Sequence, residues 1–177
     1  MAGAVDREAR FRRMCEAHTA AVLAYALRRT SREEAADVVA ETFLVAWRRL
    51  DDVDERSALP WLYAVARRVL LSQQRATRRQ QAIAERVAAG LPEASETAFG
   101  SPRVLEALAA LSEAEREVLM LTAWEELSST DAARVLGCSA TAYRIRLHRA
   151  RKRLRERLEG HVQPLAAAAR TEESPSC

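Results

Sequence analysis

The sequence contains few aromatic residues, few glycines and prolines, and almost no strand-like alternation of polar and apolar residues. Of its 177 residues, 5% are aromatic, 5 are glycine and 5 are proline, while 49% are hydrophobic and 30% are charged. This balance excludes collagen-like and disordered chains, because it supplies apolar surface for a core and few residues that break helices. The composition therefore predicts an all-α protein.

Cysteines and long apolar runs are also scarce. Cys15, Cys138 and Cys177 are widely spaced and odd in number, which argues against a disulfide framework and is typical of a reducing compartment. The N-terminus lacks the apolar segment of a signal peptide, and no run approaches the roughly 18 apolar residues that a membrane span needs. We expect a cytoplasmic protein that does not insert into a membrane.

Motifs for catalysis and for cofactor binding are missing. The sequence has no phosphate-binding glycine loop, no nucleophile elbow and no carboxylate–histidine cluster. Cys15 and His18 could share a helix face, but two ligands do not make a zinc site and no second pair follows. We therefore expect no enzymatic activity, no metal and no cofactor.

Apolar residues recur with helical spacing in seven segments. We expect helices at about 7–29, 31–50, 60–79, 102–111, 113–124, 129–136 and 140–158. Ser31 and Glu34 have the spacing of a capping box, in which each side chain accepts a hydrogen bond from the backbone N–H of the other residue. Serines at the same position before three later helices predict further N-caps: Ser112, Ser128 and Ser139.

The stretch "AAGLPEASETAFGS" interrupts this periodicity with glycine, proline, serine and glutamate. It predicts two small helical domains joined by a flexible linker. We place the first domain at residues 7–86, the linker at 87–101, the second domain at 102–158 and a C-terminal tail at 159–177.

The second domain ends with a helix, a turn that contains Gly137 and a long arginine-rich helix, which is the pattern of a helix-turn-helix. Four apolar positions predict the side that faces the core: Tyr143, Leu147, Ala150 and Leu154. The other faces carry Arg144, Ile145, His148, Arg149 and Lys152. Arginine near the start of such a helix can bind guanine edges in the major groove. The same pattern also fits a solvated basic helix or a helix of a bundle.

Two faces of the first domain have a distinct character. In "PWLYAVARRVLLSQQRATRR" the spacing of four, three and four residues forms a polar, cationic face from Arg68, Ser72, Arg75 and Arg79, opposite Leu62, Val65 and Val69. The preceding helix has its apolar stripe at Val39, Phe43, Ala46, Trp47 and Leu50. Its outer side is acidic and partly apolar, with Glu34, Asp37, Glu41 and Val45. This mixed face suits a protein partner better than DNA, although an ordinary solvated helix is the alternative.

Taken together, these segments resemble the extracytoplasmic-function (ECF) sigma factors, a group of RNA polymerase initiation subunits in the sigma-70 family. The resemblance extends over about residues 11–158. "AADVVAETFLVAW" is similar to the family's polymerase-clamp-binding helix, and "WLYAVARRVLLSQQR" to the helix that recognises and melts the −10 promoter element. "LSSTDAARVLGCSATAYRIRLHRARKRL" is similar to the domain that reads the −35 element.

The resemblance implies three sets of site residues. The polymerase-binding set is Asp37, Val38, Glu41 and Val45. The −10 set is Trp61, Arg68, Ser72, Arg75 and Arg79, with Trp61 open to either a stacking role or a core role. The −35 set is Thr141, Arg144, Ile145, His148 and Arg149. The implied partners are the clamp and flap of core RNA polymerase and promoter DNA, with an anti-sigma factor as a further candidate because many family members are regulated by one.

The chain departs from the family pattern at five positions, of which Thr141, Ala142 and Tyr143 stand where the family often has glycine, threonine and a small aliphatic residue. Family members commonly have asparagine where this chain has Arg68, and often aspartate where it has Ser72. We therefore expect an unusual −10 preference. Tyr143 replaces a small aliphatic residue, and we expect its ring to fill core volume and its hydroxyl to lie near the DNA.

Two other functions remain open on the residues alone. One is a helix-turn-helix regulator that binds a specific duplex without polymerase, with the first domain serving dimerisation or sensing. The other is a helical adaptor that binds only protein.

Overall fold

The computed structural model describes residues 2–84 and 102–160, and every regular element within these ranges is helical. The elements are α1 (Ala2–Leu27), α2 (Arg32–Arg48), the 3-10 turns η1 (Leu50–Asp52) and η2 (Glu55–Ser57), α3 (Ala58–Ala84), α4 (Pro102–Ala109), α5 (Glu113–Ala123), α6 (Ser129–Leu136) and α7 (Ala140–Gly160). The all-α prediction is confirmed. The predicted linker 87–101 lies outside the described residues, as does the tail beyond Gly160.

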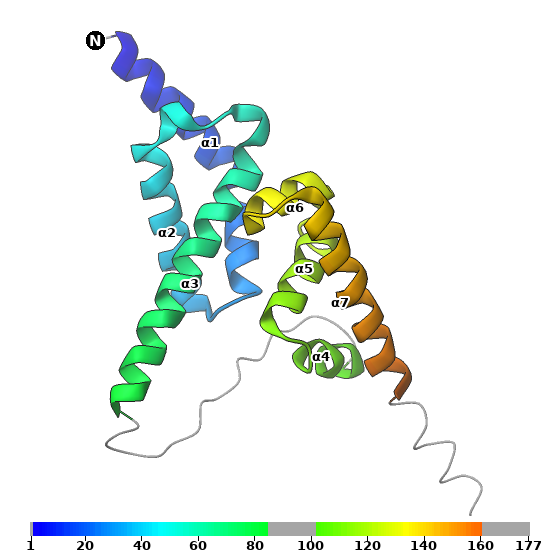
Figure 1. The fold of residues 1–177 in the computed structure, drawn as a ribbon. Coiled ribbons are helices and arrows are strands. Elements are labelled where there is room, and N and C mark those ends of the chain that lie inside the picture. The colour runs from blue at the N-terminus through cyan, green and yellow to red at the C-terminus, as the bar shows by residue number, and fades with distance from the viewer. Residues whose placement is uncertain (1, 85–101, 161–177) are drawn as a thin grey trace, which may run out of the picture. The chain divides into compact units, whose positions relative to one another are not determined.

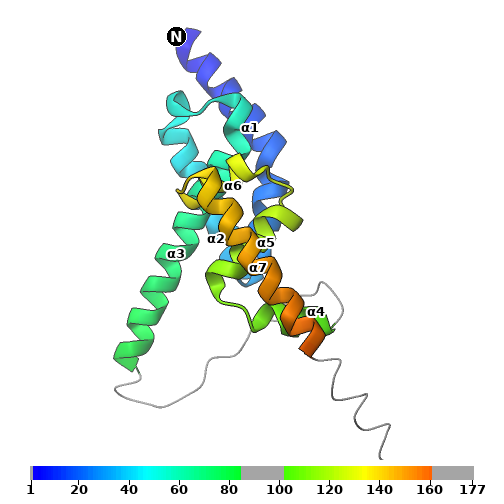
Figure 2. The same cartoon turned by 45° about the vertical axis from the view of Figure 1, so that its right-hand side comes forward.

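The chain divides into two compact units, of which the first contains α1, α2 and α3. These three helices pack against one another, as Figure 1 and Figure 2 show. Their shared core includes Val22, Tyr25 and Leu62, which are fully buried. The rings of Tyr25 and Tyr63 stack with their centroids 4.8 Å apart, so the centre of the unit joins α1 to α3. Burial of this apolar surface is the main stabilising contribution.

The start of α2 differs in one detail from the prediction. Ser31 is the N-cap, and its Oγ accepts from the backbone N–H of Glu34 at 3.3 Å, as expected. The carboxylate of Glu34, however, accepts from the hydroxyl of Thr30. The expected reciprocal bond, in which the Ser31 N–H donates to the Glu34 carboxylate, is therefore replaced, because a hydroxyl one residue earlier is a competing donor for the same carboxylate.

The second unit contains α4, α5 and α7, and α6 is described with it because a tight turn joins α6 to α7. Gly137 lies in that turn with a positive φ of 67°, and its N–H donates to the carbonyl of Arg134. Glycine adopts this conformation without the strain that a Cβ causes. The predicted helix-turn-helix is thus present, with α6 and α7 as its two helices.

Helix α5 packs against α7, and three predicted core residues of α7 are buried: Tyr143, Leu147 and Ala150. Leu154, the fourth, is half-buried. The hydroxyl of Tyr143 donates to the carbonyl of Val118 at 2.8 Å and lies 2.7 Å from the Thr122 hydroxyl. The expectation that this hydroxyl lies near DNA is therefore wrong. A buried phenol needs a partner, and α5 supplies two.

We expect Tyr143→Phe to lower the free energy of unfolding by about 1 kcal/mol, since it removes the hydroxyl's contacts with Val118 and Thr122 while it keeps the ring in place. Urea unfolding of the full-length chain, followed by circular dichroism, measures this change. The control is Ile145→Ala on the same helix, where the side chain is 49% exposed and we expect little change in stability. Equal losses of unfolding free energy in the two variants would contradict a stabilising role for the Tyr143 hydroxyl.

The N-terminus of α5 carries the predicted Ser112 N-cap, which Glu115 completes to a capping box. Ser112 Oγ accepts from the Glu115 N–H, and Glu115 Oε2 accepts from the Ser112 N–H at 3.1 Å. Arg153 Nη1 donates to Glu115 Oε1 at 2.6 Å, which ties α7 to the start of α5. The hydrogen bond from the Ser112 hydroxyl is the main cause that lowers the pKa of Glu115, and Arg153 adds to it.

This lowered pKa predicts a pH-dependent contribution to stability. Because the pKa is lower in the folded state than in the unfolded state, ionised Glu115 stabilises the fold at neutral pH, and this contribution is lost as pH falls through the folded pKa. Glu115→Gln keeps a capping side chain but removes the charge. We expect its stability deficit at pH 7 to shrink at pH 3, as measured by urea unfolding at each pH. A deficit that does not change with pH would contradict the prediction.

Candidate nucleic-acid and partner interfaces

The exposed face of α7 carries the five residues of the predicted −35 set. Thr141, Arg144, Ile145, His148 and Arg149 are all solvent-exposed. Ser139 caps the helix by accepting from the Ala142 N–H at 3.1 Å, and Arg144 Nη2 lies 3.3 Å from Thr141 Oγ1. Cations that flank an exposed isoleucine suit a DNA groove, where arginine binds guanine and an apolar side chain contacts a thymine methyl group.

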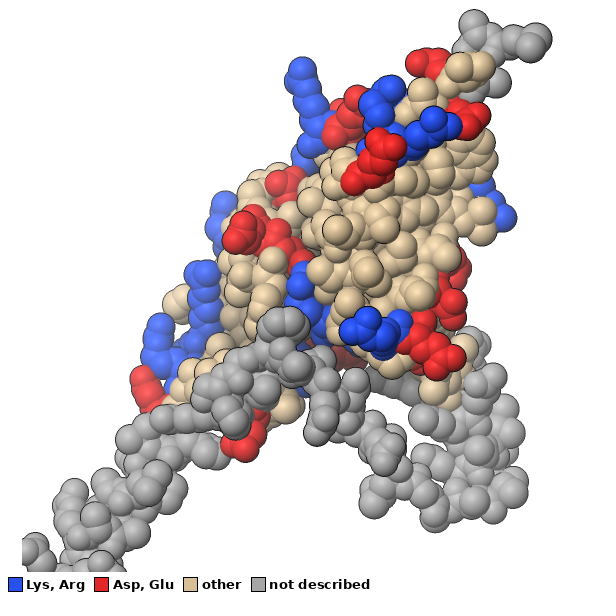
Figure 3. Space-filling model, turned by 180° about the vertical axis from the view of Figure 1, so that it is seen from behind, with Lys and Arg blue, Asp and Glu red and all other residues tan. Residues whose placement is uncertain are grey.

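A groove of about 420 Å³ between α5 and α7 extends this basic surface. It is lined by Arg146, Arg149, Lys152 and Arg153, together with Val118, Ala114 and the carboxylates of Glu115 and Glu156. Figure 3 shows basic side chains following one another along α7 at the left of the view. Four cations outnumber two carboxylates in the groove, so it favours an anionic ligand such as a phosphate backbone. The groove could not be predicted from the periodicity of a single helix, because its lining comes from two helices.

Helix α3 presents the second basic surface. Arg68, Ser72 and Arg75 are exposed, while Leu62, Val65 and Val69 are buried in the core of the first unit. The backbone of Arg79 continues α3, but its side chain lies outside the described residues. Trp61 is half-buried in the first turn of the helix. Its exposure fits both of the roles considered for it, a core contact and a stacking surface.

The outer face of α2 contains a correction to the predicted polymerase-binding set. Asp37 and Glu41 are exposed and Val45 is half-buried, but Val38 is completely buried. Val38 belongs to the core of the first unit and is not available to a partner. Helical spacing instead brings Leu44 into line with Asp37 and Glu41, and its side chain is 48% exposed. The intervals of four and three residues were the signal in the sequence that could have identified Leu44.

Trp47 also differs from its predicted position in the apolar stripe. Its side chain is 37% exposed, although its ring packs edge-on against Phe11 with centroids 5.1 Å apart. The guanidinium of Arg7 lies 5.1 Å from the centre of the Trp47 ring. This residue therefore joins α1 to α2 at the edge of the core, with its side chain partly exposed.

The described part of the chain shows no group of three or more histidine, cysteine or acidic side chains that could bind a metal. Cys15 and His18 are half-buried on α1. Burial raises the pKa of the Cys15 thiol, with Glu16 adding to the effect, and burial lowers the pKa of His18. None of the described helices is long and apolar enough to span a bilayer.

Two family models match this chain, one in each unit. The family model described as "Sigma-70 region 2" matches residues 14–80, and the one described as "Sigma-70, region 4" matches residues 102–154. The ECF RNA polymerase sigma factor SigL of Mycobacterium tuberculosis is 32% identical to this chain over 168 residues, which cover 90% of this chain and 95% of SigL. The chain belongs to the ECF sigma factors of the sigma-70 family.

Other relatives of this sigma factor agree with the assignment. CnrH of Cupriavidus metallidurans is 35% identical over 133 residues, which cover 67% of this chain and 70% of CnrH. Among solved structures, RpoE of Bartonella quintana, bound to the anti-sigma factor NepR, has a TM-score of 0.67 at 28% identity, covering 84% of this chain and 96% of RpoE. CnrH in complex with the cytosolic domain of CnrY has a TM-score of 0.56 at 29% identity, covering 85% of this chain and 88% of CnrH.

The family consists of transcription initiation factors that are not enzymes. The general role of this chain is therefore that of an alternative sigma factor in transcription initiation.

Proposed function

We propose that this sigma factor binds core RNA polymerase, directs it to promoters with defined −35 and −10 elements, and promotes opening of the DNA. The observation that carries the proposal is the presence of two exposed basic helix faces, one in each matched segment. They are the α3 face and the α7 face. Two separate cationic surfaces suit two separate contacts on one promoter.

At the −35 element, α7 enters the major groove. Arg144 and Arg149 bind base edges or phosphates, Ile145 and Thr141 supply apolar contacts, and His148 lies between them. The Gly137 turn and α6 hold α7 at a fixed angle, as the first helix of a helix-turn-helix does. The groove beside Arg149 receives the phosphate backbone.

At the −10 element, α3 and the connection before it hold the non-template strand. Each base that leaves the stack costs a few kcal/mol, which stacking and phosphate neutralisation must offset. Arg68, Arg75 and Arg79 supply positive charge, and Ser72 supplies a hydroxyl. Trp61 either stacks on a base or supports the first turn of the helix from the core side.

Polymerase binds the outer face of α2. Asp37 and Glu41 pair with cations of the clamp, and Leu44 and Val45 supply apolar contact.

Residues 7–86 and 102–158 act as the two functional domains, and residues 87–101 pass over the polymerase surface between them. The flap contacts the second domain. RpoE has a structure in complex with the anti-sigma factor NepR, and CnrH has one in complex with the cytosolic domain of CnrY. We therefore include an anti-sigma factor among the partners. The protein works in the cytoplasm, where polymerase and DNA lie.

In vitro transcription tests this function. Purified protein is added to sigma-free core polymerase on fragmented genomic DNA, and transcript 5′ ends are mapped. We expect discrete starts that share two spaced motifs and disappear without the protein. No new starts, together with specific duplex binding by the protein alone, would instead identify a free-standing helix-turn-helix regulator. No DNA binding in either state would identify a protein-binding adaptor.

A separate prediction concerns the −10 preference. Arg68 and Ser72 are both exposed on α3, and they replace two small polar residues common in the family by a cation and a hydroxyl. We expect initiation on a library with a randomised −10 element to favour a sequence other than the commonest family motif. The double variant Arg68→Asn, Ser72→Asp should move the preference toward that motif. A wild-type preference for the common motif would contradict the prediction.

A further inference from the structure

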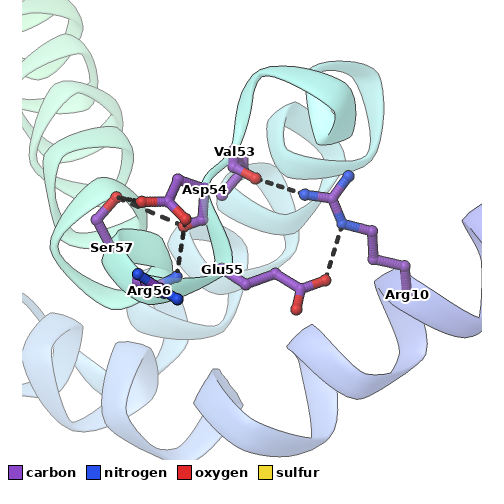
Figure 4. Close-up of polar contacts among 6 residues, drawn as sticks. All are labelled: Arg10, Val53, Asp54, Glu55, Arg56 and Ser57. Atoms are coloured by element: carbon purple, nitrogen blue, oxygen red, sulfur yellow. Dashed lines mark hydrogen bonds and ion pairs between the residues drawn. The ribbon is translucent and has the colours of Figure 1, made fainter.

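The connection between α2 and α3 is anchored to the first helix by Arg10. Arg10 Nη2 donates to the carbonyl oxygen of Val53 at 2.5 Å, and Arg10 Nε donates to Glu55 Oε1 at 3.1 Å. Figure 4 shows the guanidinium reaching from α1 to the connection and contacting it at these two points. The Arg10 side chain is only 26% exposed, and its bond to the Val53 carbonyl is partly shielded from water, whereas Glu55 is exposed. A planar guanidinium bound at two points fixes both the position and the orientation of its partner.

Arg7, one helical turn earlier, holds the start of the same connection. Its Nη1 donates to Asp51 Oδ2 at 3.0 Å, and its Nη2 donates to the carbonyl of Trp47 at 2.7 Å. Two arginines on one face of α1 therefore bind the chain from the end of α2 to Glu55. Figure 3 shows acidic and basic side chains close together at this end of the first unit.

The connection also has internal order, and it leads into α3 without a break. Val53 is 2% exposed, so its side chain packs into the core while its carbonyl faces Arg10. Asp54 caps η2 by accepting from the Arg56 N–H at 3.1 Å and from the Ser57 hydroxyl at 3.4 Å. The 3-10 turn η2 ends at Ser57 and α3 begins at Ala58. The position of the connection relative to the exposed face of α3 is thus set from α1.

We propose that Arg10 is a positioning residue for single-strand capture: it holds the connection 51–57 in place beside α3 before the DNA opens. This inference rests on the proposed function, in which the connection and α3 together bind the opened −10 strand. A segment that is ordered before binding loses little conformational freedom when the strand docks. A connection released from α1 has to become ordered in the same step, and binding weakens accordingly.

The test measures binding of a single-stranded oligonucleotide, which carries the mapped −10 sequence, to the assembled holoenzyme. We expect Arg10→Ala to weaken this binding about tenfold, because ordering of the connection then opposes docking. Binding of a duplex with only the −35 element should stay within twofold of wild type, and so should affinity for core polymerase. Because Arg10 does not touch the DNA, the salt dependence of oligonucleotide binding should be unchanged.

Arg12→Ala is the matched control. Arg12 lies on the same helix but pairs with Glu8 within α1, at 2.9 Å, and both side chains are largely exposed. We expect it to behave as wild type in every assay. Glu55→Ala is the second test variant. It removes one of the two Arg10 contacts at an exposed position, so it should fold even where Arg10→Ala does not, and it should give a smaller loss in the same direction.

Each result decides the inference. Selective weakening of single-strand binding at an unchanged salt dependence supports it. Unchanged binding in both test variants overturns it while the proposed function stands. A parallel loss of affinity for core polymerase would show a general structural role for Arg10 and overturn the inference. A reduced salt dependence of oligonucleotide binding would show a direct phosphate contact by Arg10 and also overturn the inference. A wild-type holoenzyme that does not prefer the −10 oligonucleotide overturns the proposed function and the inference together.

Discussion

Replacing Arg144 or Arg149 with alanine is expected to weaken −35-dependent initiation by about 1–3 kcal/mol each, or roughly 5- to 150-fold. Both side chains are exposed on the face of α7 that is free of core contacts. An arginine that forks onto guanine loses two hydrogen bonds on truncation, and the base loses its partner. Multiple-round transcription by reconstituted holoenzyme on a promoter with both elements measures the loss.

The design of the template separates base reading from phosphate binding. If an arginine reads a base, its alanine variant should tolerate substitutions at one −35 position that wild type rejects. If it binds phosphate, all sequences should lose activity to a similar extent. The slope of the logarithm of DNA affinity against the logarithm of salt concentration should then become smaller by about one. Arg157→Ala is the control, since Arg157 is an exposed arginine in the last turn of the same helix. A loss in this control as large as in the two test variants would contradict the assignment of the recognition face.

Reversing the charge of Asp37 and Glu41 together, as Asp37→Arg and Glu41→Arg, is expected to weaken binding to core polymerase by at least about tenfold. Both carboxylates are exposed on one face of α2. Like charges placed opposite a cationic partner surface repel it, and the effect should shrink as salt is raised because exposed charges are screened. Competition with a labelled sigma factor for core polymerase measures the affinity.

Leu44→Ala tests the apolar part of the same face. Its side chain is 48% exposed in the free protein, so truncation should leave the fold stable while it weakens polymerase binding in a salt-independent way. Glu16→Arg, a charge reversal at an exposed position of α1, is the control and should bind as wild type. Normal affinity in both the charge-reversal and Leu44 variants would remove α2 from the polymerase interface.

Local patterns account for much of the agreement between sequence and structure. The starts of α5 and α7 were predictable because a serine N-cap accepts from a backbone N–H three residues later, which is a contact within one turn. The turn at Gly137 was equally predictable, because glycine commonly adopts the positive φ that ends a helix, as it does here after α6. The exposed faces of α3 and α7 follow from helical periodicity, which places Arg68, Ser72 and Arg75 along one side of α3, and Arg144 away from Tyr143.

Long-range contacts account for the differences. Val38 was expected in the polymerase-binding set, but the packing of α1 and α3 around α2 buries it. The hydroxyl of Tyr143 turns to the carbonyl of Val118 because α5 lies against α7. Glu34 bonds to Thr30 because two donors compete at the helix start.

The sequence by itself determined the helices, their caps, the two basic faces and the family resemblance that the comparisons confirm. These features depend on residues within one or two turns of each other, or on motifs in fixed order. The tertiary structure alone decided that Val38 of α2 is buried, where the groove between α5 and α7 lies, and that Arg10 reaches the carbonyl of Val53. Those contacts join residues far apart in the chain, and helical periodicity contains no information about which helices meet.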